Sequence, residues 1–166
     1  MVRAFRQLLP KALGALVIGL LFTCDGPRFV EAGPRDALDA GEVVIETAVG
    51  GRHRFRVEIA RTAEQQMIGL MYRRRLAADA GMLFDYPEMP EVAMWMKNTL
   101  IPLDIIYIGA NGRIVRIYQR AVPHSLTAMP SGGPVRGVLE VNGGTVDRLV
   151  VSVGDKVRHP LFEGAR

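Results

Sequence analysis

One short segment, LDIIYI at residues 103–108, places the strongest constraint on how this chain can fold. In an extended strand alternate residues point to opposite faces, and here both faces are apolar. Such a strand must be covered on both sides, which predicts a central strand in a layered β structure. The turn signal Ala110–Gly112 follows it, and a further apolar segment begins at Ile114, so the two segments form a predicted hairpin.

The remaining pattern is also mainly β. Residues 42–60, EVVIETAVGGRHRFRVEIA, alternate around a Gly50–Gly51 turn and predict another hairpin. Thr62 and Gln65 form a capping box before the apolar stripe Met67, Ile68 and Met71, which predicts a short helix. A second short helix is expected near Thr145. About seven strands and two short helices predict a mainly β fold, a compact antiparallel β-sandwich or barrel.

The first residues have the order of an export signal. Basic residues precede an uncharged run, Ala12–Phe22, and polar residues follow it. We therefore expect residues 1–24 to be a signal peptide and the protein to be periplasmic or secreted. Residues 25–41 are rich in Gly, Pro and charge and predict a flexible linker, which leaves residues 42–160 as a single globular domain.

Cys24 is the only cysteine in the chain, so no intramolecular disulfide can form. Its position directly after the apolar run is that of an acylated cysteine, which makes the protein a possible membrane-tethered lipoprotein. Thr23 and Phe22 are larger than the residues usual before such a cysteine. The alternative is plain cleavage between Thr23 and Gly33.

The positive charge of the chain depends strongly on the predicted signal. Removal of residues 1–23 takes away three of the 21 Lys and Arg residues and no acidic residue, so the net charge falls from +4 to +1. We therefore expect no nucleic-acid partner, and contact with a membrane only through the signal or a lipid anchor. No cofactor-binding motif is present, and no cofactor is expected.

Five residues of the central region are the candidate ligand-binding residues. They are polar or aromatic side chains within apolar sequence: Trp95, Lys97, Asn98, Asp104 and Glu140. One interpretation is structural, with Lys97 paired to a carboxylate and Asn98 fixing a bend. The other is a pocket for a small polar or glycan-like ligand, or a contact for an envelope protein, with Trp95 as a stacking surface.

Two further functions remain open. A hydrolase or transferase could use Lys97, Asp104 and Glu140 together with His124, although no known nucleophile or zinc signature is present. The third hypothesis is Cu(I) binding, because thioethers favour soft metals, although methionine is also a common core filler. Its candidate ligands are the seven methionines after Met1: Met67, Met71, Met82, Met89, Met94, Met96 and Met129.

Several segments together resemble a known family. They are GLM at 69–71, GMLF at 81–84, WMKNTLIPLDIIYI at 95–108, NGRIV at 111–115 and VLEVNGGTVDRL at 138–149, with VGD at 153–155. The chain is similar over most of residues 42–158 to the bacterial and archaeal family named domain of unknown function 192. The resemblance implies a compact jelly-roll-like β-sandwich with small helices, often exported. It implies no reaction, since that family has no agreed activity.

Overall fold

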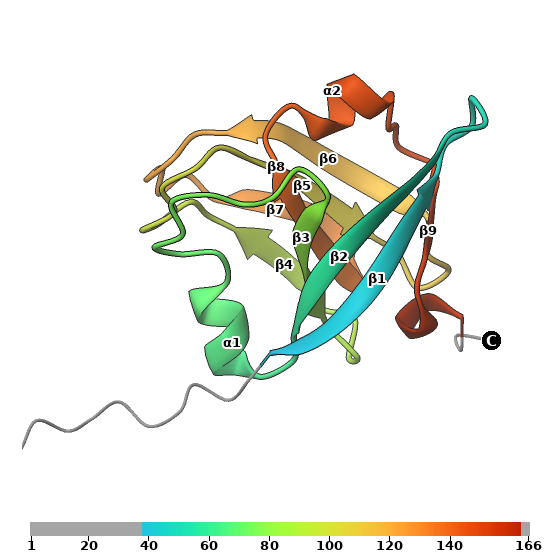
Figure 1. Cartoon of the computed structure of the whole chain (residues 1–166). Coiled ribbons are helices and arrows are strands. Elements are labelled where there is room, and N and C mark those ends of the chain that lie inside the picture. The colour runs from blue at the N-terminus through green and yellow to red at the C-terminus, as the bar shows by residue number, and fades with distance from the viewer. Residues whose placement is uncertain (1–37, 164–166) are drawn as a thin grey trace, which may run out of the picture. The chain divides into compact units, whose positions relative to one another are not determined.

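A computed structural model describes residues 38–163 of the chain (Figure 1). Within this range the predicted mainly β class with two short helices is confirmed. The strands are β1 (Asp39–Glu46), β2 (Arg52–Ala60), β3 (Ala80–Asp85), β4 (Glu91–Met94), β5 (Leu103–Ile108), β6 (Ile114–Ala121), β7 (Met129–Pro134), β8 (Gly137–Asn142) and β9 (Lys156–Arg158). The helices are α1 (Ala63–Ile68) and α2 (Thr145–Leu149), and a 3-10 turn covers Pro160–Phe162. Strand β1 begins three residues before the predicted start of the domain.

Seven strands form one strongly curled sheet in the order β6-β5-β8-β3-β2-β1-β9. The two outer strands approach each other through a bridge between Arg113 and Lys156. Backbone bonds extend this seam, because Ile114 N–H donates to the Asp155 carbonyl at 2.9 Å and Val157 N–H donates to the Gly112 carbonyl at 2.7 Å. The sheet is therefore closed along part of its length, which is the barrel form of the prediction.

One strand pair departs from the predicted antiparallel pattern. Strands β2 and β3 are parallel, whereas the other neighbours in the sheet are antiparallel. A parallel pair needs a crossover connection, and residues 61–79, which include α1, provide it. This crossover carries α1 to the side of the sheet where the small β4-β7 sheet also lies.

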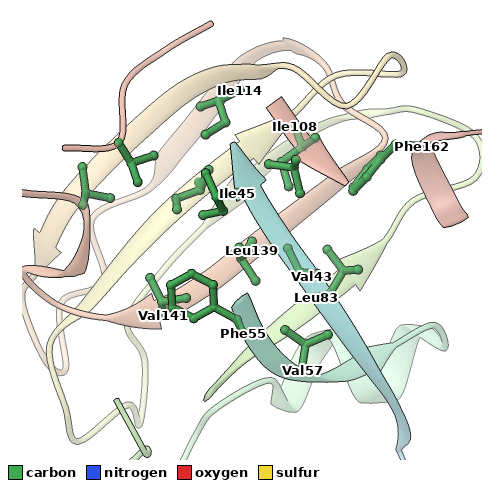
Figure 2. Packing of buried hydrophobic residues seen from close by; sticks show 14 of the residues in the cluster. Val43, Ile45, Phe55, Val57, Leu83, Ile108, Ile114, Leu139, Val141 and Phe162 are labelled. Carbon is green, nitrogen blue, oxygen red and sulfur yellow. The ribbon is translucent and has the colours of Figure 1, made fainter. Parts of the chain in front are cut away.

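The first hydrophobic core fills the inside of the curled sheet (Figure 2). Alternate residues of each strand contribute to it, for example Val43 and Ile45 of β1 and Leu139 and Val141 of β8, all at 0% exposure. Phe162 of the 3-10 turn, near the C-terminus of the chain, is also part of this cluster. The predicted first hairpin is confirmed, with its apolar residues in this core.

A second core lies on the outer face of β3, β5 and β8. Its main residues are Ala60, Leu70, Met82, Phe84, Met94, Met96, Leu103, Ile105, Tyr107, Ala121, Met129, Val135 and Val138. The β4-β7 sheet and the segment after α1 supply part of this set, so β5 is covered on both sides. All six residues of β5 are buried, as its sequence predicts.

Helix α1 begins where the sequence predicts, but its predicted apolar face is not buried. Thr62 and Gln65 form the capping box, but the helix ends at Ile68 and contains no buried residue. Met67 is 63% exposed, so the predicted core stripe is wrong, because the chain leaves the helix before a full apolar face can form. Gly69 follows with φ 48°, and a Cβ there would lie 3.1 Å from Phe84 Cζ. The close backbone approach expected at this glycine is therefore present.

Candidate functional site

Glu140 occupies an unusual place for a carboxylic acid. It lies on β8 between Met82 of β3 and Ile105 of β5, and it faces the second core. Its neighbours Leu139 and Val141 point into the first core, as alternation along a strand requires. Only 4% of Glu140 is exposed. The charge-bearing group therefore sits in the middle of an apolar layer.

The carboxyl group of Glu140 has no partner within residues 38–163. Burial alone raises its pKa to about 8, and no hydrogen bond or basic side chain opposes that rise. Within the same residues every fully buried side-chain oxygen has a hydrogen-bond partner, so the unpaired Glu140 oxygens are not completely enclosed. They open into a pocket that Glu140 helps to line. An acid left unpaired in this way is costly to the fold and is a frequent mark of a functional site.

The pocket has a volume of about 290 Å³, and most of the residues that line it are apolar. Its walls come from α1 and the segment after it, from β3, and from the end of β4. They comprise Ala63, Gln66, Met67, Ile68, Gly69, Leu70, Met71, Phe84, Tyr86, Ala93, Met94, Trp95, Thr99 and Glu140. Burial and the nearby Glu140 charge raise the pKa of Tyr86 to about 12, so its phenol stays protonated at neutral pH.

Trp95 and Lys97 lie at the mouth of this pocket. Trp95 lines it with 46% of its surface exposed, and the Lys97 ammonium group lies 5.2 Å from the centre of the indole ring. Lys97 is exposed, and no ion pair joins it to Asp104 or Glu140 in the described part of the chain. The pairing considered from sequence is therefore absent, and a cation–π contact takes its place.

Asn98 holds two segments of the pocket rim together. Its side-chain amide donates to the Tyr72 hydroxyl at 2.8 Å, and its carbonyl accepts the Tyr72 N–H at 2.9 Å. Both residues have positive φ, 54° for Asn98 and 65° for Tyr72. Backbone in this region is strained for residues with a side chain, and such strain tends to cluster at functional sites. Asn98 therefore shapes the rim and does not line the pocket.

Asp104 lies on the other side of the sheet, away from the pocket. It is fully buried, and its carboxylate accepts three backbone N–H groups, from Arg120 at 2.7 Å, Gly144 at 3.0 Å and Val146 at 2.8 Å. The last two belong to the start of α2, whose positive end favours a carboxylate. Asp104 therefore has a structural role, because its hydrogen bonds connect β5 to β6 and to the start of α2.

His124 is also separate from Glu140. Its side chain is exposed in the loop after β6, and its φ is 62°. Its backbone N–H donates to the Thr99 carbonyl at 3.2 Å, which places this loop beside the pocket rim. The acid–base group proposed from Lys97, Asp104, Glu140 and His124 is therefore not assembled around one cavity.

The seven methionines after Met1 differ in burial: four are buried, two are exposed, and Met71 is half-buried. Met82, Met94, Met96 and Met129 are buried in the second core, as core fillers are expected to be. Met67 and Met89 are exposed by 63% and 40%. Met67, Met71 and Met94 line the same pocket, and Met71 Sδ accepts a weak contact from the Asn98 amide at 3.9 Å. Copper binding by these residues stays a prediction.

Two larger hollows have charged walls, but most of their charges are already paired. The hollow of about 770 Å³ includes Arg61 and Arg136, and both contact Asp85. The hollow of about 600 Å³ includes Arg56 and Arg73, which pair with Asp79 and Glu58. Glu140 differs because its carboxyl group has no such partner. We therefore place the candidate site in the smaller pocket.

Sequence reasoning identified Trp95 and Glu140 and missed the rest of the pocket. The sequence around Phe84, Tyr86 and Gly69 is typical of core or loop residues. These three residues line one pocket only because the crossover between β2 and β3 brings their segments together. A single carboxylate inside the apolar strand at residues 137–142 was the signal that pointed to the site. Cys24 lies outside the described residues, as do the predicted signal and most of the predicted linker.

Two solved structures are similar to this chain over most of its length. A protein from Sinorhizobium meliloti 1021, described as a "putative transcription regulator", shares 46% identity, with a TM-score of 0.73, over 75% of this chain and 97% of its own. A protein of unknown function from Novosphingobium aromaticivorans DSM 12444 shares 42% identity, with a TM-score of 0.72, over 76% of this chain and 89% of its own. No curated protein matches the chain.

The family resemblance noted in the sequence is confirmed at the level of the whole domain. Residues 44–159 match the family model DUF192, described as Uncharacterized ACR. This match runs from β1 to the start of the 3-10 turn and includes every strand that builds the pocket. The chain belongs to the DUF192 family.

Proposed function

We propose that this chain is a non-catalytic binding protein of the cell envelope, and that the pocket beside Glu140 holds a small ligand with one polar group. One observation carries the proposal: the buried, unpaired carboxyl group of Glu140 opens into a cavity. A fold that needed only stability would be better served by an apolar residue at this position. The ligand would provide the missing hydrogen-bond or charge partner.

The surroundings of the pocket support a binding role. Trp95 offers a half-exposed aromatic surface at the mouth. Three loops meet at the rim, where Tyr72, Asn98 and His124 all adopt positive φ. Such loops on a rigid sheet are common positions for recognition, because the scaffold fixes them while their residues stay accessible. The pocket has few polar side chains, so a compact ligand fits it better than a glycan with many hydroxyl groups.

The enzymatic alternative has less support. Glu140 has a pKa suited to acid–base work near neutral pH, but a reaction needs further groups around the same substrate. Asp104 is occupied by three backbone N–H groups, and His124 is exposed on a separate loop. We therefore propose binding and not turnover.

Nucleic-acid binding also has less support, despite the description of the Sinorhizobium relative. Affinity for phosphates depends on basic side chains that are free to replace counterions. Many arginines of this domain are already paired with carboxylates: Arg54 with Glu42, Arg56 with Asp79, Arg73 with Glu58, Arg120 with Asp147 and Arg158 with Glu46. We propose no nucleic-acid partner.

The place of action in this proposal rests on sequence. Residues 1–24 have the charge and hydropathy order of a signal peptide. Within residues 38–163, no helix is both long and apolar enough to span a membrane. The proposed protein therefore works in the periplasm or outside the cell, either free or held by a lipid on Cys24.

A thermal-shift screen of small molecules tests the binding proposal, since a ligand that binds only the native state raises the melting temperature. The screen uses protein purified from cells that express the full chain. Ala93 is exposed and lines the pocket, so Ala93→Phe should block the mouth without disturbing a core. Ala128 is exposed and does not line it, so Ala128→Phe is the matched control. Hits should be lost in the first variant and kept in the second; equal retention in both would contradict the proposal.

A further inference from the structure

We infer that the occupant of the Glu140 pocket is a small organic cation, an ammonium group carried on an apolar body. This inference rests on the proposed binding function and narrows its ligand class. It follows from the size of the pocket, from the polar groups that remain unused in its wall, and from the aromatic and thioether surfaces around the carboxyl group.

The size of the pocket limits the ligand to a compact molecule. The volume is about 290 Å³, and a water molecule occupies roughly 30 Å³ of liquid. The pocket volume lies at the small end of the range of ligand pockets, so the part of a ligand that the pocket encloses is compact. A single aromatic ring with a short amine-bearing chain has a suitable size.

The unused polar groups are too few for a sugar. The Gln66 amide already donates to the Asp85 carbonyl at 2.8 Å, and the Thr99 hydroxyl donates to the Lys97 carbonyl at 3.3 Å. The Glu140 carboxyl group and the Tyr86 hydroxyl remain, together with the Gln66 Oε1 acceptor. One carboxylate and one phenol can satisfy the N–H groups of a single ammonium ion, but they cannot satisfy the several hydroxyls of a sugar.

The apolar walls are of the kind that suits a cation. Phe84 and Tyr86 line the pocket, and the faces of aromatic rings attract positive charge; the indole ring of Trp95, which also lines it, is already in contact with Lys97. Thioethers such as those of Met67 and Met94 are polarisable and adapt to the shape of the bound molecule. No basic residue lines this pocket, and the Lys97 ammonium group beside it is exposed to solvent, which screens its repulsion of a bound cation.

Binding of a cation is then linked to the ionisation of Glu140. In the free protein its pKa is about 8, so at pH 6 about 1% of the groups are ionised and at pH 8 about half. The charged ligand pairs with the ionised form, and binding releases a proton. Affinity should therefore rise about 50-fold between pH 6 and pH 8, while an alkyl ammonium ion, with a pKa near 10, stays charged throughout.

The other titratable groups near Glu140 do not produce this dependence. They are the phenols of Tyr86, which follows β3, and of Tyr107 on β5, with Tyr118 of β6 edge-on to Tyr107. Burial raises the pKa of both Tyr86 and Tyr107. Tyr107 also donates its hydroxyl to the Met129 carbonyl. Both therefore keep their protons between pH 6 and pH 8.

The test compares phenethylamine with 2-phenylethanol, which has the same shape and no charge. Calorimetric titration uses protein purified from cells that express the full chain, at pH 6, 7 and 8. We expect the amine to bind with a Kd of about 1 mM at pH 8, at least about tenfold more tightly than the alcohol. The amine should show the 50-fold pH dependence, and Glu140→Gln should remove both the preference and the pH dependence.

The possible failures separate this inference from the proposed function. Equal affinity for the alcohol and the amine, or unchanged amine binding in Glu140→Gln, overturns the inference that the ligand is a cation. The proposed binding role of the pocket is not affected by that result. In another outcome, neither probe binds while another compound from the screen does bind and is lost in Ala93→Phe. That result also overturns only the inference that the ligand is a cation. Failure of both probes together with an empty screen overturns the inference and the proposed function.

Discussion

The carboxylate of Asp104 accepts the backbone N–H of Val146 at 2.8 Å and so ties the central strand β5 to the start of helix α2. Arg120 and Gly144 donate to the same carboxylate. Three backbone donors, one buried and two partly buried, thus depend on one side chain. Asp104 is therefore expected to serve stability and not ligand binding.

Replacement of Asp104 should strongly destabilise the fold. Asp104→Ala leaves one buried and two partly buried N–H groups without this acceptor, at about 1–3 kcal/mol each, so the free energy of unfolding should fall by about 3–5 kcal/mol. Urea unfolding measures the loss. The control is Asp147→Ala, which removes an exposed partner of Arg120 and should change stability by less than about 1 kcal/mol. Equal effects of the two substitutions would contradict the structural role of Asp104.

Glu140 should make the stability of the free protein fall as pH rises. Its pKa is about 8 when folded, against 4.5 as the ordinary value, so the folded state binds more protons between these values. Stability is then fully present below pH 4.5 and is lost progressively up to pH 8, by roughly a few kcal/mol. Glu140→Gln should remove most of this dependence and stabilise the protein at pH 8. Urea unfolding at pH 5 and pH 8 would contradict the expectation if wild type and variant changed in parallel.

Gly69 should resist replacement because it forms one wall of the pocket in a conformation that side chains rarely adopt. Its φ is 48°, and an added Cβ would lie 3.1 Å from the Phe84 ring. Gly69→Ala should lower stability by about 1–3 kcal/mol. Gly133 has open space around it and no positive φ, so Gly133→Ala should be nearly neutral. Melting temperatures of the two variants provide the comparison, and matching values would argue against a strained Gly69.

Lys97 and Trp95 should affect binding more than folding. Lys97 is exposed, and within residues 38–163 the indole ring of Trp95 is its one charged or aromatic partner. Lys97→Met should therefore change the free energy of unfolding by less than about 1 kcal/mol. Trp95→Ala should weaken any pocket ligand while the melting temperature stays near that of the wild type. A large loss of stability in either variant would show that these side chains are structural.

The N-terminal residues should be removed during export. Mass spectrometry of protein from the cell envelope should find a mature chain that begins at Cys24 with an added lipid, or a plain chain cut between Thr23 and Gly33. Cys24→Ala distinguishes the two, because it abolishes membrane retention only when the cysteine is acylated. An intact Met1 in the purified protein would contradict export.

The local pattern of the sequence predicted much of this fold. Alternation separates Met94 and Met96 from Trp95 and Lys97, and the structure buries the first pair and exposes the second. The two-sided apolar pattern of residues 103–108 identified the central strand. These successes share one cause, since burial along a strand depends mainly on which neighbours are apolar.

The parts that sequence could not supply depend on contacts between distant segments. The three donors to Asp104 come from residues 16, 40 and 42 positions away, and no local rule points to them. The parallel pairing of β2 and β3 carries the segment after α1 over the outer face, where it meets Glu140. The apolar spacing of Met67 and Ile68 also misled, because a six-residue helix is too short to bury a full face.

The seam at β9 has a consequence for synthesis of the chain. Strand β1 pairs with β9, and β9 also meets the segment that starts β6, so the last strand made locks the first one in place. A growing polypeptide lacks β9 until residues 156–158 have been made, and one edge of β1 stays unpaired until then. The closed sheet, and with it the protection of this edge from proteases, can therefore form only after β9 is present.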